Sequence, residues 1–543
     1  MNLSQLNDAM ELARSHEQSN RQDLAEAIYR NLITSYPQYH PPYQSLGLMA
    51  FAAGNLPFAA QLFQSAIACG KHVGVYHRNF GEICRRLGRV AEAVESGREA
   101  CRLMPMDIDS HFNLALALSD ARLPEETRQA FSRVVELQET ADAHGNSTPK
   151  LWNQRAVALH RMERFAEARE SYEKVLALDP EFVAAHNGLG SALRETGFLA
   201  ESLEHLTKAV QLSPGFADAR LNLGMTQMQL GDWHNGWENY EARWTGSIEG
   251  NTGTFARPHC PLPQWSGSGE TENQAILIFA EQGFGDAFQF SRYIDLLAAR
   301  FAKIAVVFPW NSVQLLMESS FGDRVLLLKQ MPHDFTLWDW HCPLMSLPRA
   351  FRSLPGNVPA NVPYLKVSLQ AKRYWKERLD RATTAQLRIG VAWQGRRSHQ
   401  YDLRRSVEFA RLTPLLQEEN ITWVSLQKFD ENETPPTVPA DVRWIDWTGE
   451  LLDFSDTAAL MSNLDLIISI DSSMAHLAGA LGKPVWMLNR FDSEWRWMRQ
   501  SETSVWYPSM RIFNQPKFAD WDSVIANAKS ALQELRSQVS LNS

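Results

Sequence analysis

The segment AEQGFGDAF (280–288) combines two glycines with an acidic residue directly after a short apolar run. Gly283 and Gly285 permit a tight turn, and a helix that begins near Asp286 would present free backbone N–H groups at its start. Asp286 has two interpretations. It either stabilises the start of that helix through the helix dipole, or it is a general base that accepts a proton from a substrate.

The segment WQGRRSHQYDLRRS (393–406) gathers positive charge around a glycine in a chain whose net charge is -9. Its arginines are Arg396, Arg397, Arg404 and Arg405. Guanidinium groups donate paired hydrogen bonds to phosphate oxygens, so such a loop suits a diphosphate. The alternative is a solvated basic loop that binds no ligand.

The segment SIDSSMAHLAGALGKP (469–484) places polar side chains where an apolar run ends. Asp471 closes the run, Ser472 and Ser473 begin a helical pattern, and His476 lies one turn into it. Serine at a helix start caps the helix and leaves N–H groups for an anion. For His476 the alternative is a partly buried ring that is bonded to a neighbouring carbonyl group.

All three segments follow strands of a predicted α/β fold. Short apolar runs alternate with helical patterns, which predicts parallel sheets with helices on both faces. The runs fall into two sets, so we expect two Rossmann-like halves with a cleft between them. The expected strands are 275–280, 303–308, 324–328, 388–393, 422–427, 464–470 and 484–488, and the expected helices include 286–300, 407–417, 455–463 and 520–537.

The first turn lacks the full fingerprint of a dinucleotide-binding fold. Phe288 stands where the third glycine would be, and the second expected strand runs into VVFPWN without an acidic residue. These departures argue against an NAD or FAD enzyme, and we expect no cofactor.

The first half of the chain repeats with a period of 34 residues, as the spacing of Pro180 and Pro214 shows. A small residue at a helix crossing lets two backbones approach, a large one fills the adjacent gap, and stacked units bury a shared core. This predicts an α-solenoid of seven helix pairs, which resembles tetratricopeptide repeats. The small positions include Ala13, Gly47, Gly81, Ala115, Ala156, Gly190 and Gly224, and the large positions include Tyr29, Phe63, Phe131, Tyr172, Leu206 and Tyr240.

The composition changes along the chain suggest five parts. We expect the repeat solenoid at 1–246, a connector rich in Gly, Pro, Ser and Thr at 247–273, and a first Rossmann-like half at 274–366. A bridge at 367–386 and a second, nucleotide-sugar-binding half with a closing helix at 387–543 complete the chain. The aromatic end of the last repeat, GDWHNGWENYEARW (231–244), predicts that this repeat docks against the next domain.

The bulk composition excludes several classes of protein. A net charge of -9 argues against a general nucleic-acid binder. The sequence has no run of eighteen apolar residues and no signal-peptide core, so we expect a cytoplasmic protein without a membrane span. The five cysteines show no zinc-binding spacing, and we expect no bound metal.

Taken together, the three polar segments resemble glycosyltransferase family 9, the heptosyltransferase-like family with the two-Rossmann GT-B fold. The GFGD turn, the Arg-Arg-Ser loop and the Asp-Ser-Ser-Met-Ala-His block stand in the order of that family. The tail EWRWMRQSETSVWYPSMRIFNQP (494–516) is similar to bacterial proteins that join tetratricopeptide repeats to such a domain. The resemblance covers about 274–535, and with the repeats nearly the whole chain.

The resemblance implies that a sugar passes from a nucleotide-sugar to an acceptor hydroxyl, with inversion and without an essential metal. Asp286 matches the family's proposed base, and Arg405 falls near a basic residue that holds the leaving diphosphate. Ser472 stands where threonine is common in the family, and the loop has arginine in place of lysine. The implied donor and phosphate-binding residues are Gly283, Gly285, Arg404, Arg405, Asp471, Ser472, Ser473 and His476.

Two functions from different classes follow. The first is a glycosyltransferase whose repeats hold a protein or peptide acceptor on their concave face, as in relatives that glycosylate proteins. The second is a repeat scaffold or adaptor with an inactive transferase-like domain. A lipopolysaccharide heptosyltransferase would share the chemistry of the first, but it calls for a basic or amphipathic membrane face, and the sequence shows none.

Overall fold

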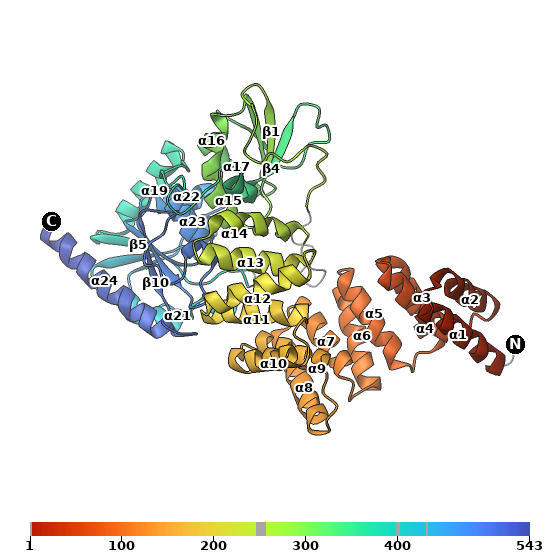
Figure 1. Ribbon diagram of the computed structural model, residues 1–543. Coiled ribbons are helices and arrows are strands. Elements are labelled where there is room, and N and C mark those ends of the chain that lie inside the picture. The colour runs from red at the N-terminus through yellow and green to blue at the C-terminus, as the bar shows by residue number, and fades with distance from the viewer. Residues whose placement is uncertain (1–2, 246–256, 398–401, 431–432, 543) are drawn as a thin grey trace. The chain divides into compact units, whose positions relative to one another are not determined.

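The computed structural model describes residues 3–245, 257–397, 402–430 and 433–542, and the chain divides into two compact units (Figure 1). The first unit holds residues up to 196 and residues 204–219; the second holds 197–203, 220–244 and the described residues from 257 onward. The first ten residues of the expected connector, 247–256, lie outside the described residues. In the described part of the chain, none of the helices is both long and apolar enough to cross a membrane.

The repeat region consists of antiparallel helix pairs, in red to yellow in Figure 1. Its helices are α1 (Leu3–Gln18), α2 (Gln22–Ser35), α3 (Pro41–Ala52), α4 (Leu56–Cys69), α5 (Gly74–Arg86), α6 (Val90–Leu103), α7 (Ile108–Asp120), α8 (Pro124–Ala143), α9 (Pro149–Arg161), α10 (Phe165–Leu178), α11 (Val183–Thr196), α12 (Leu199–Leu212), α13 (Ala217–Gln229) and α14 (Trp233–Tyr240). The predicted α-solenoid is therefore confirmed.

The small and large positions of the period lie where the helices cross. A Cβ atom on Gly81 would stand 3.3 Å from the carbonyl oxygen of Ala93, so a larger residue there would push α5 away from α6. The large residues Phe63 and Tyr172 are wholly buried, as the period predicts. Within the first unit α5 packs on α7, α7 on α9 and α9 on α11, so the first helices of successive pairs form a continuous layer.

The seventh helix pair belongs to the second unit. Trp233 of α14 stacks on Trp506 with ring centroids 5.2 Å apart, and Trp237 meets Trp495 edge-on at 5.1 Å. The indole N–H of Trp237 donates to the carbonyl oxygen of Ser353. Aromatic pairs of this kind contribute roughly 0.5–1.5 kcal/mol each beyond their burial. The aromatic end of the last repeat thus docks on the α/β region, as the sequence predicts.

The α/β region contains two parallel sheets, as expected. The first has the order β3-β2-β1-β4 and pairs Ile276 with Ile304. Its strands are β1 (Ala275–Phe279), β2 (Lys303–Val307), β3 (Leu326–Leu328) and β4 (Trp340–Pro343), and its helices are η1 (Glu241–Trp244, which continues α14), α15 (Phe284–Phe290), η2 (Ser291–Tyr293), α16 (Ile294–Ala298), α17 (Asn311–Phe321), η3 (Leu344–Ser346) and α18 (Leu347–Ala350).

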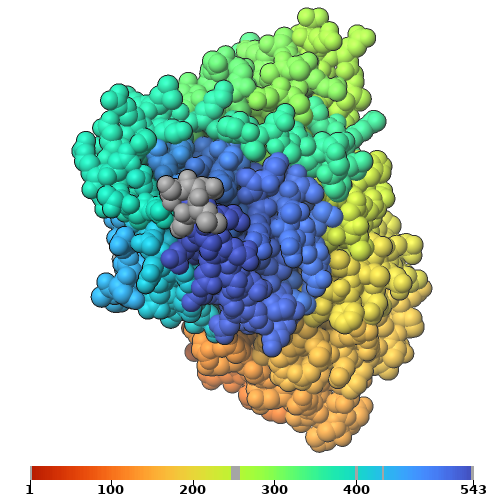
Figure 2. Space-filling model, turned by 90° about the vertical axis from the view of Figure 1, so that its left-hand side faces the viewer, coloured from red at the N-terminus to blue at the C-terminus, as the bar shows by residue number. Residues whose placement is uncertain are grey.

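The second sheet has the order β10-β9-β8-β5-β6-β7. Figure 2 shows this half, in cyan and blue, facing the viewer, with the first half in green above it. Its strands are β5 (Leu387–Ala392), β6 (Ile421–Ser425), β7 (Trp444–Ile445), β8 (Leu466–Ile470), β9 (Val485–Asn489) and β10 (Met510–Asn514), and its helices are α20 (Asp402–Arg405), α21 (Phe409–Leu416), η4 (Thr448–Glu450), α22 (Phe454–Met461), α23 (Ser473–Ala480), η5 (Trp495–Trp497) and α24 (Trp521–Asn542), with α19 (Leu369–Ala382) preceding β5.

One apolar core runs through α14 and both halves, and it includes Trp233, Phe288 and Leu477. Where the sequence predicts a cleft, α15 packs directly on α23 and α17 on α22. Gly285 allows this approach, because a Cβ atom there would lie 2.8 Å from Cδ2 of His476 in α23. The strands β4, β7 and β10 were not expected from the sequence. The first is short and ends at Pro343, and the second has only two residues. In the third, the polar residues Arg511 and Asn514 break the apolar pattern.

Replacement of Gly224 by alanine should destabilise the second unit, although alanine is the better helix former. A Cβ atom on Gly224 would lie 2.9 Å from both the Gly236 carbonyl oxygen and the Tyr240 amide nitrogen. We expect Gly224→Ala to lower the free energy of unfolding by about 1–3 kcal/mol, as for other overpacked sites. Denaturant unfolding followed by tryptophan fluorescence measures the change.

Gly449→Ala, in η4 of the same unit, is the control, since no atom lies within 4 Å of the added Cβ. It should change the same free energy by less than about 0.5 kcal/mol. Equal effects of the two variants would contradict the proposed close approach of α13 and α14.

Candidate functional site

The turn after β1 leads directly into α15, and Asp286 caps that helix. The backbone N–H of Gly283 donates to Oδ2 of Asp286 at 3.1 Å, which closes the first turn. The helix-capping interpretation of Asp286 therefore describes one of its two carboxylate oxygens. The side chain keeps 19% of its surface exposed, so it is reachable from solvent.

The other oxygen of Asp286 forms an ion pair with Arg496 of η5. Arg496 also pairs with Glu494, and its Nε donates to the side-chain oxygen of Gln289 at 2.7 Å. Its side chain is only 8% exposed. Burial opposes the charge, but Glu494 and Asp286 together raise the pKa of Arg496 above its ordinary value. This guanidinium joins the first half, through Asp286 and Gln289, to the second half.

The block after β8 forms the other side of the site. Ser472 caps α23, because its hydroxyl accepts the backbone N–H of Met474 at 3.3 Å, and Ser473 is the first residue of the helix. His476 lies in the first turn and is 5% exposed. A Cβ atom on Gly285 would stand 2.8 Å from Cδ2 of His476, so the histidine ring packs directly on the GFGD turn.

Neighbouring groups fix the ring of His476. Its Nδ1 lies 3.0 Å from the hydroxyl of Tyr507, and its ring is tilted over that of Trp497 with centroids 5.1 Å apart. Burial lowers the pKa of His476 to about 3 against the opposing charge of Asp471, and the positive charge of Arg496 lowers it further. His476 is therefore neutral near pH 7. The ring is not bonded to a backbone carbonyl through Nδ1, which was the alternative interpretation.

Arg405 of α20 reaches the same block. Its Nη1 donates to the backbone carbonyl of Asp471 at 3.1 Å. Burial opposes the charge of Asp471, but the positive charges near it, Arg405 among them, more than compensate, so the pKa of Asp471 is lowered. Arg404 pairs instead with Asp492, at 2.9 Å, in the segment that follows β9. Both arginines therefore lie at the carboxyl end of the second sheet.

The four arginines of the predicted basic loop are not held together. Arg396 and Arg397 are exposed, and Arg397 pairs with Glu433 at 3.1 Å. Residues 398–401 of the loop lie outside the described residues. The other predicted residues lie around the contact of α15 with α23, and they are Gly283, Gly285, Asp286, Arg405, Asp471, Ser472, Ser473 and His476. Arg404 is next to Arg405 in α20 and pairs with Asp492.

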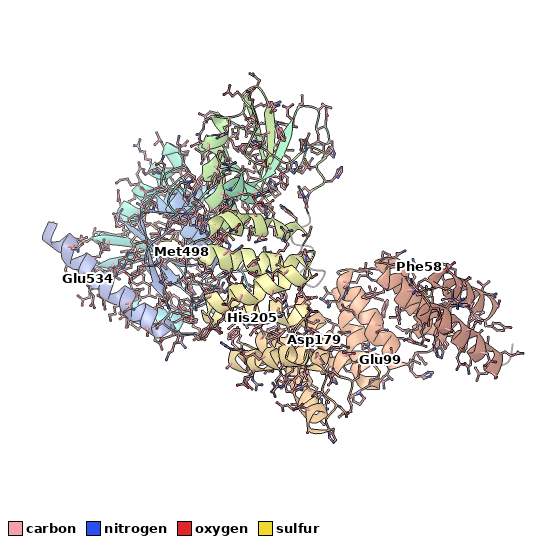
Figure 3. All side chains as sticks on the ribbon, in the orientation of Figure 1. Phe58, Glu99, Asp179, His205, Met498 and Glu534 are labelled. Atoms are coloured by element: carbon pink, nitrogen blue, oxygen red, sulfur yellow. The ribbon has the colours of Figure 1, made fainter. Side chains whose placement is uncertain are left out.

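The sequence analysis assigned no role to Arg496, Glu494 or Tyr507. Their segment was recognised only as part of the similar tail. A usable signal was present, because Arg496 stands between two tryptophans in EWRWM, soon after a buried strand. A charged residue inside an aromatic run is expected to be buried and paired. Figure 3 labels Met498, the residue that follows η5, within the α/β region.

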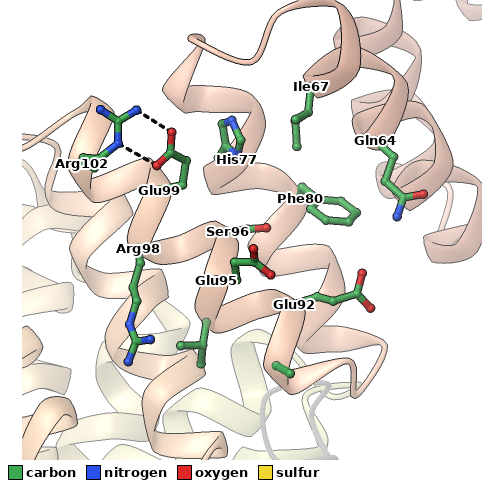
Figure 4. Close-up of a pocket in the computed structure, with 12 residues that line it drawn as sticks. Gln64, Ile67, His77, Phe80, Glu92, Glu95, Ser96, Arg98, Glu99 and Arg102 are labelled. Carbon is green, nitrogen blue, oxygen red and sulfur yellow. Dashed lines mark hydrogen bonds and ion pairs between the residues drawn. The ribbon is translucent and has the colours of Figure 1, made fainter.

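A separate hollow of about 600 Å³ lies in the repeats (Figure 4). Most of its lining comes from α6, with Ile67 of α4 and Phe80 of α5 at its apolar side. Glu99 and Arg102, both on its rim, pair with each other at 2.6 Å. Its lining contains none of the residues of the predicted site.

Comparison with protein families separates two regions. Tetratricopeptide repeat models match residues 9–39 and 153–215. The model of glycosyltransferase family 9 (heptosyltransferase) matches residues 405–498, a range that includes Arg405, Asp471, His476 and Arg496. The chain carries tetratricopeptide repeats followed by a glycosyltransferase family 9 domain. Asp286 precedes the matched range of that family 9 domain.

One similar protein aligns with nearly the whole chain, and two solved repeat proteins align with part of it. The chain is 23% identical to Protein FlbA of Caulobacter vibrioides (strain ATCC 19089 / CIP 103742 / CB 15) across 97% of this chain and 90% of that protein. A tetratricopeptide repeat protein from Parabacteroides merdae is 14% identical with a TM-score of 0.36, covering 45% of this chain and 93% of that one. TTC0263, a tetratricopeptide repeat protein of Thermus thermophilus, is 20% identical with a TM-score of 0.30, covering 34% and 97%.

The buried neutral state of His476 predicts an acid-sensitive family 9 domain. Its pKa of about 3 lies below the ordinary value of 6.5, so below pH 6.5 the unfolded chain binds a proton that the folded chain does not. Stability should fall as the pH drops from 6.5 toward 3. A shift of one pKa unit corresponds to roughly 1.4 kcal/mol, so between pH 7 and 5 we expect wild type to lose about 1–2 kcal/mol more than His476→Asn. Denaturant titrations at both pH values test this, and equal losses would show that His476 titrates normally.

Proposed function

We propose that this protein is a glycosyltransferase that moves a sugar from a nucleotide-sugar to an acceptor hydroxyl. The observation that carries the proposal is the contact between the two halves. There the GFGD turn packs on His476 through Gly285, and Asp286 of the same turn is paired with Arg496. His476 and Arg496 both lie in the range matched by family 9.

Asp286 is the proposed base. Its carboxylate would take the proton of the acceptor hydroxyl while the acceptor oxygen bonds to the anomeric carbon of the sugar. The bond from that carbon to the phosphate oxygen breaks on the opposite face, and its electron pair leaves with the nucleoside diphosphate. One displacement of this kind inverts the anomeric centre.

The second half would hold the leaving diphosphate. The diphosphate would lie at the start of α23, where the helix dipole favours an anion although Ser472 already accepts the N–H groups of Met474, Ala475 and His476. Arg405 holds positive charge beside Asp471. Arg404 extends this charge toward the segment after β9. Fixed donors and arginines aimed at developing negative charge can do the work that a divalent metal does in other transferases, so we propose a metal-independent reaction.

The repeats are the proposed holding site for a protein or peptide acceptor. Charged side chains follow one another on the layer of first helices. Arg78 of α5 lies 3.7 Å from Asp109 of α7, and Lys150 of α9 lies 2.7 Å from the same carboxylate. Tetratricopeptide arrays use extended inner surfaces to bind their partners, and this polar row supports an acceptor of mixed charge on that face.

A repeat scaffold with an inactive family 9 domain is the second candidate. It is favoured by the fact that both oxygens of Asp286 are already bonded, one to the Gly283 N–H and one to Arg496. Each carboxylate oxygen has two lone pairs, so a proton can still be accepted. Measurement of turnover separates the two candidates.

A nucleotide diphosphate should stabilise the purified protein. We would measure thermal unfolding with UDP, GDP, ADP and CMP, since a ligand present at 100 times its Kd adds roughly 2.7 kcal/mol to the folded state. One nucleotide should raise the midpoint, and Asp471→Ala with His476→Ala should abolish the shift. If millimolar concentrations of all four nucleotides leave the midpoint unchanged, the result favours a repeat scaffold over an active transferase.

Asp286→Asn should keep nucleotide binding and lose transfer. Removing a general base typically lowers kcat by roughly 10²–10⁴-fold, and the side-chain amide can preserve the cap. Asp295→Asn is the matched control, because Asp295 also pairs with an arginine, Arg324, but lies in α16. Initial rates with the identified donor check both variants. Full activity of Asp286→Asn would exclude Asp286 as the base.

A further inference from the structure

The end of the last repeat reaches the turn that carries Asp286. Arg243 lies in η1, directly after α14, and its guanidinium meets Glu281 with both nitrogens of one edge. Nη2 is 2.9 Å from Oε1 and Nε is 3.3 Å from Oε2. The side chains are 6% and 3% exposed, so the pair is buried.

Glu281 stands at the entrance of that turn. It follows Ala280 at the end of β1 and precedes Gly283 by two residues. Its Oε1 also accepts the backbone N–H of Met345 at 3.1 Å. Two anchors, one from the repeat and one from η3, which follows the strand neighbouring β1, therefore fix the chain just before Gly283.

The other N–H groups of Arg243 bond to residues of η1 and η3. Nη1 lies 2.7 Å from Glu241, and Nη2 donates to the hydroxyl of Ser346 at 2.8 Å. Burial raises the pKa of Glu281 to about 7 in spite of Arg243, which lowers it.

The ion pair between Arg243 and Glu281 is not needed merely to attach the last repeat to the α/β region. Trp233 and Trp237 already dock α14 on Trp506 and Trp495, and Trp237 adds a hydrogen bond to Ser353. A buried ion pair is weak evidence for stability, because apolar side chains often replace one without loss. What the ion pair adds, and the aromatic contacts do not, is a bond to the turn itself.

We propose that Arg243 is a positioning residue supplied by the last tetratricopeptide repeat, which holds the GFGD turn in place through Glu281. The proposal rests on the proposed function in one respect only, namely that Asp286 acts in the reaction. The repeat array is in this view part of the catalytic unit, since its final helix pair sets the position of the base.

The test uses two variants of the full-length chain. Arg243→Met combined with Glu281→Gln removes the pair without leaving a charge on Glu281, and Glu241 keeps its hydrogen bonds from Ser346 and Gln264. Arg243→Lys keeps the charge but loses the forked contact. Arg349→Met is the matched control. Arg349 also links α14 to the first half, through Glu238 at 2.8 Å, but does not contact the turn.

Amide hydrogen exchange of peptides covering 280–290 is the first readout, and it is independent of activity. Both Arg243 variants should speed exchange in this segment, while the control leaves it unchanged. In transfer assays kcat should fall roughly tenfold or more, because small misplacements of reacting groups are costly. KM for the donor should stay within about twofold, since the donor site lies in the other half.

Exchange at the wild-type rate in both Arg243 variants would overturn the proposal, whether or not transfer is observed. A fall in kcat that the Arg349 control shares equally would also overturn it, because attachment of α14 would then be the cause. If wild type transfers no sugar, the proposed function fails, and the exchange measurement still decides whether Arg243 positions the turn.

Discussion

A buried guanidinium needs partners for its charge, and that constraint organises the second unit. Arg496 is almost wholly covered, so the cost of removing its charge from water must be offset by carboxylates and hydrogen bonds. Asp286 and Gln289 supply them from the first half, and Glu494 from the second. One side chain therefore ties the two halves together and holds the carboxylate of Asp286.

The seventh helix pair shares one apolar core with the α/β region, whereas the earlier helix pairs bury a core of their own. The first six helix pairs bury small and large residues at a fixed period, and each pair packs on the next. The seventh pair departs from this scheme, because its outer face is aromatic and meets Trp495 and Trp506. An end repeat must cover its exposed face, and here the α/β region covers it.

The sequence predicted most of the fold because its signals are local. The period of 34 residues located the helix pairs, and buried apolar runs located the strands from β1 to β9 apart from β4 and β7. The residues after those strands were found for the same reason, since the chain itself places Asp286, Asp471 and His476 at strand ends. Arg496, Glu281 and Arg243 could not be assigned in this way. The aromatic run around Arg496 could mark it as buried and paired, but the partners of these residues lie 38 to 210 positions away, and no local pattern names them.

The stacked indoles of Trp233 and Trp506 give the molecule an internal optical reporter. Their ring centroids are 5.2 Å apart and their planes nearly parallel, at 19°. Electronic transitions on two such chromophores couple, so the near-ultraviolet circular dichroism should contain a band that neither indole gives alone. That band would vanish when the final helix pair separates from the two α/β halves. Detachment of the repeats could thus be followed without any label, in the same sample and at the same time as unfolding.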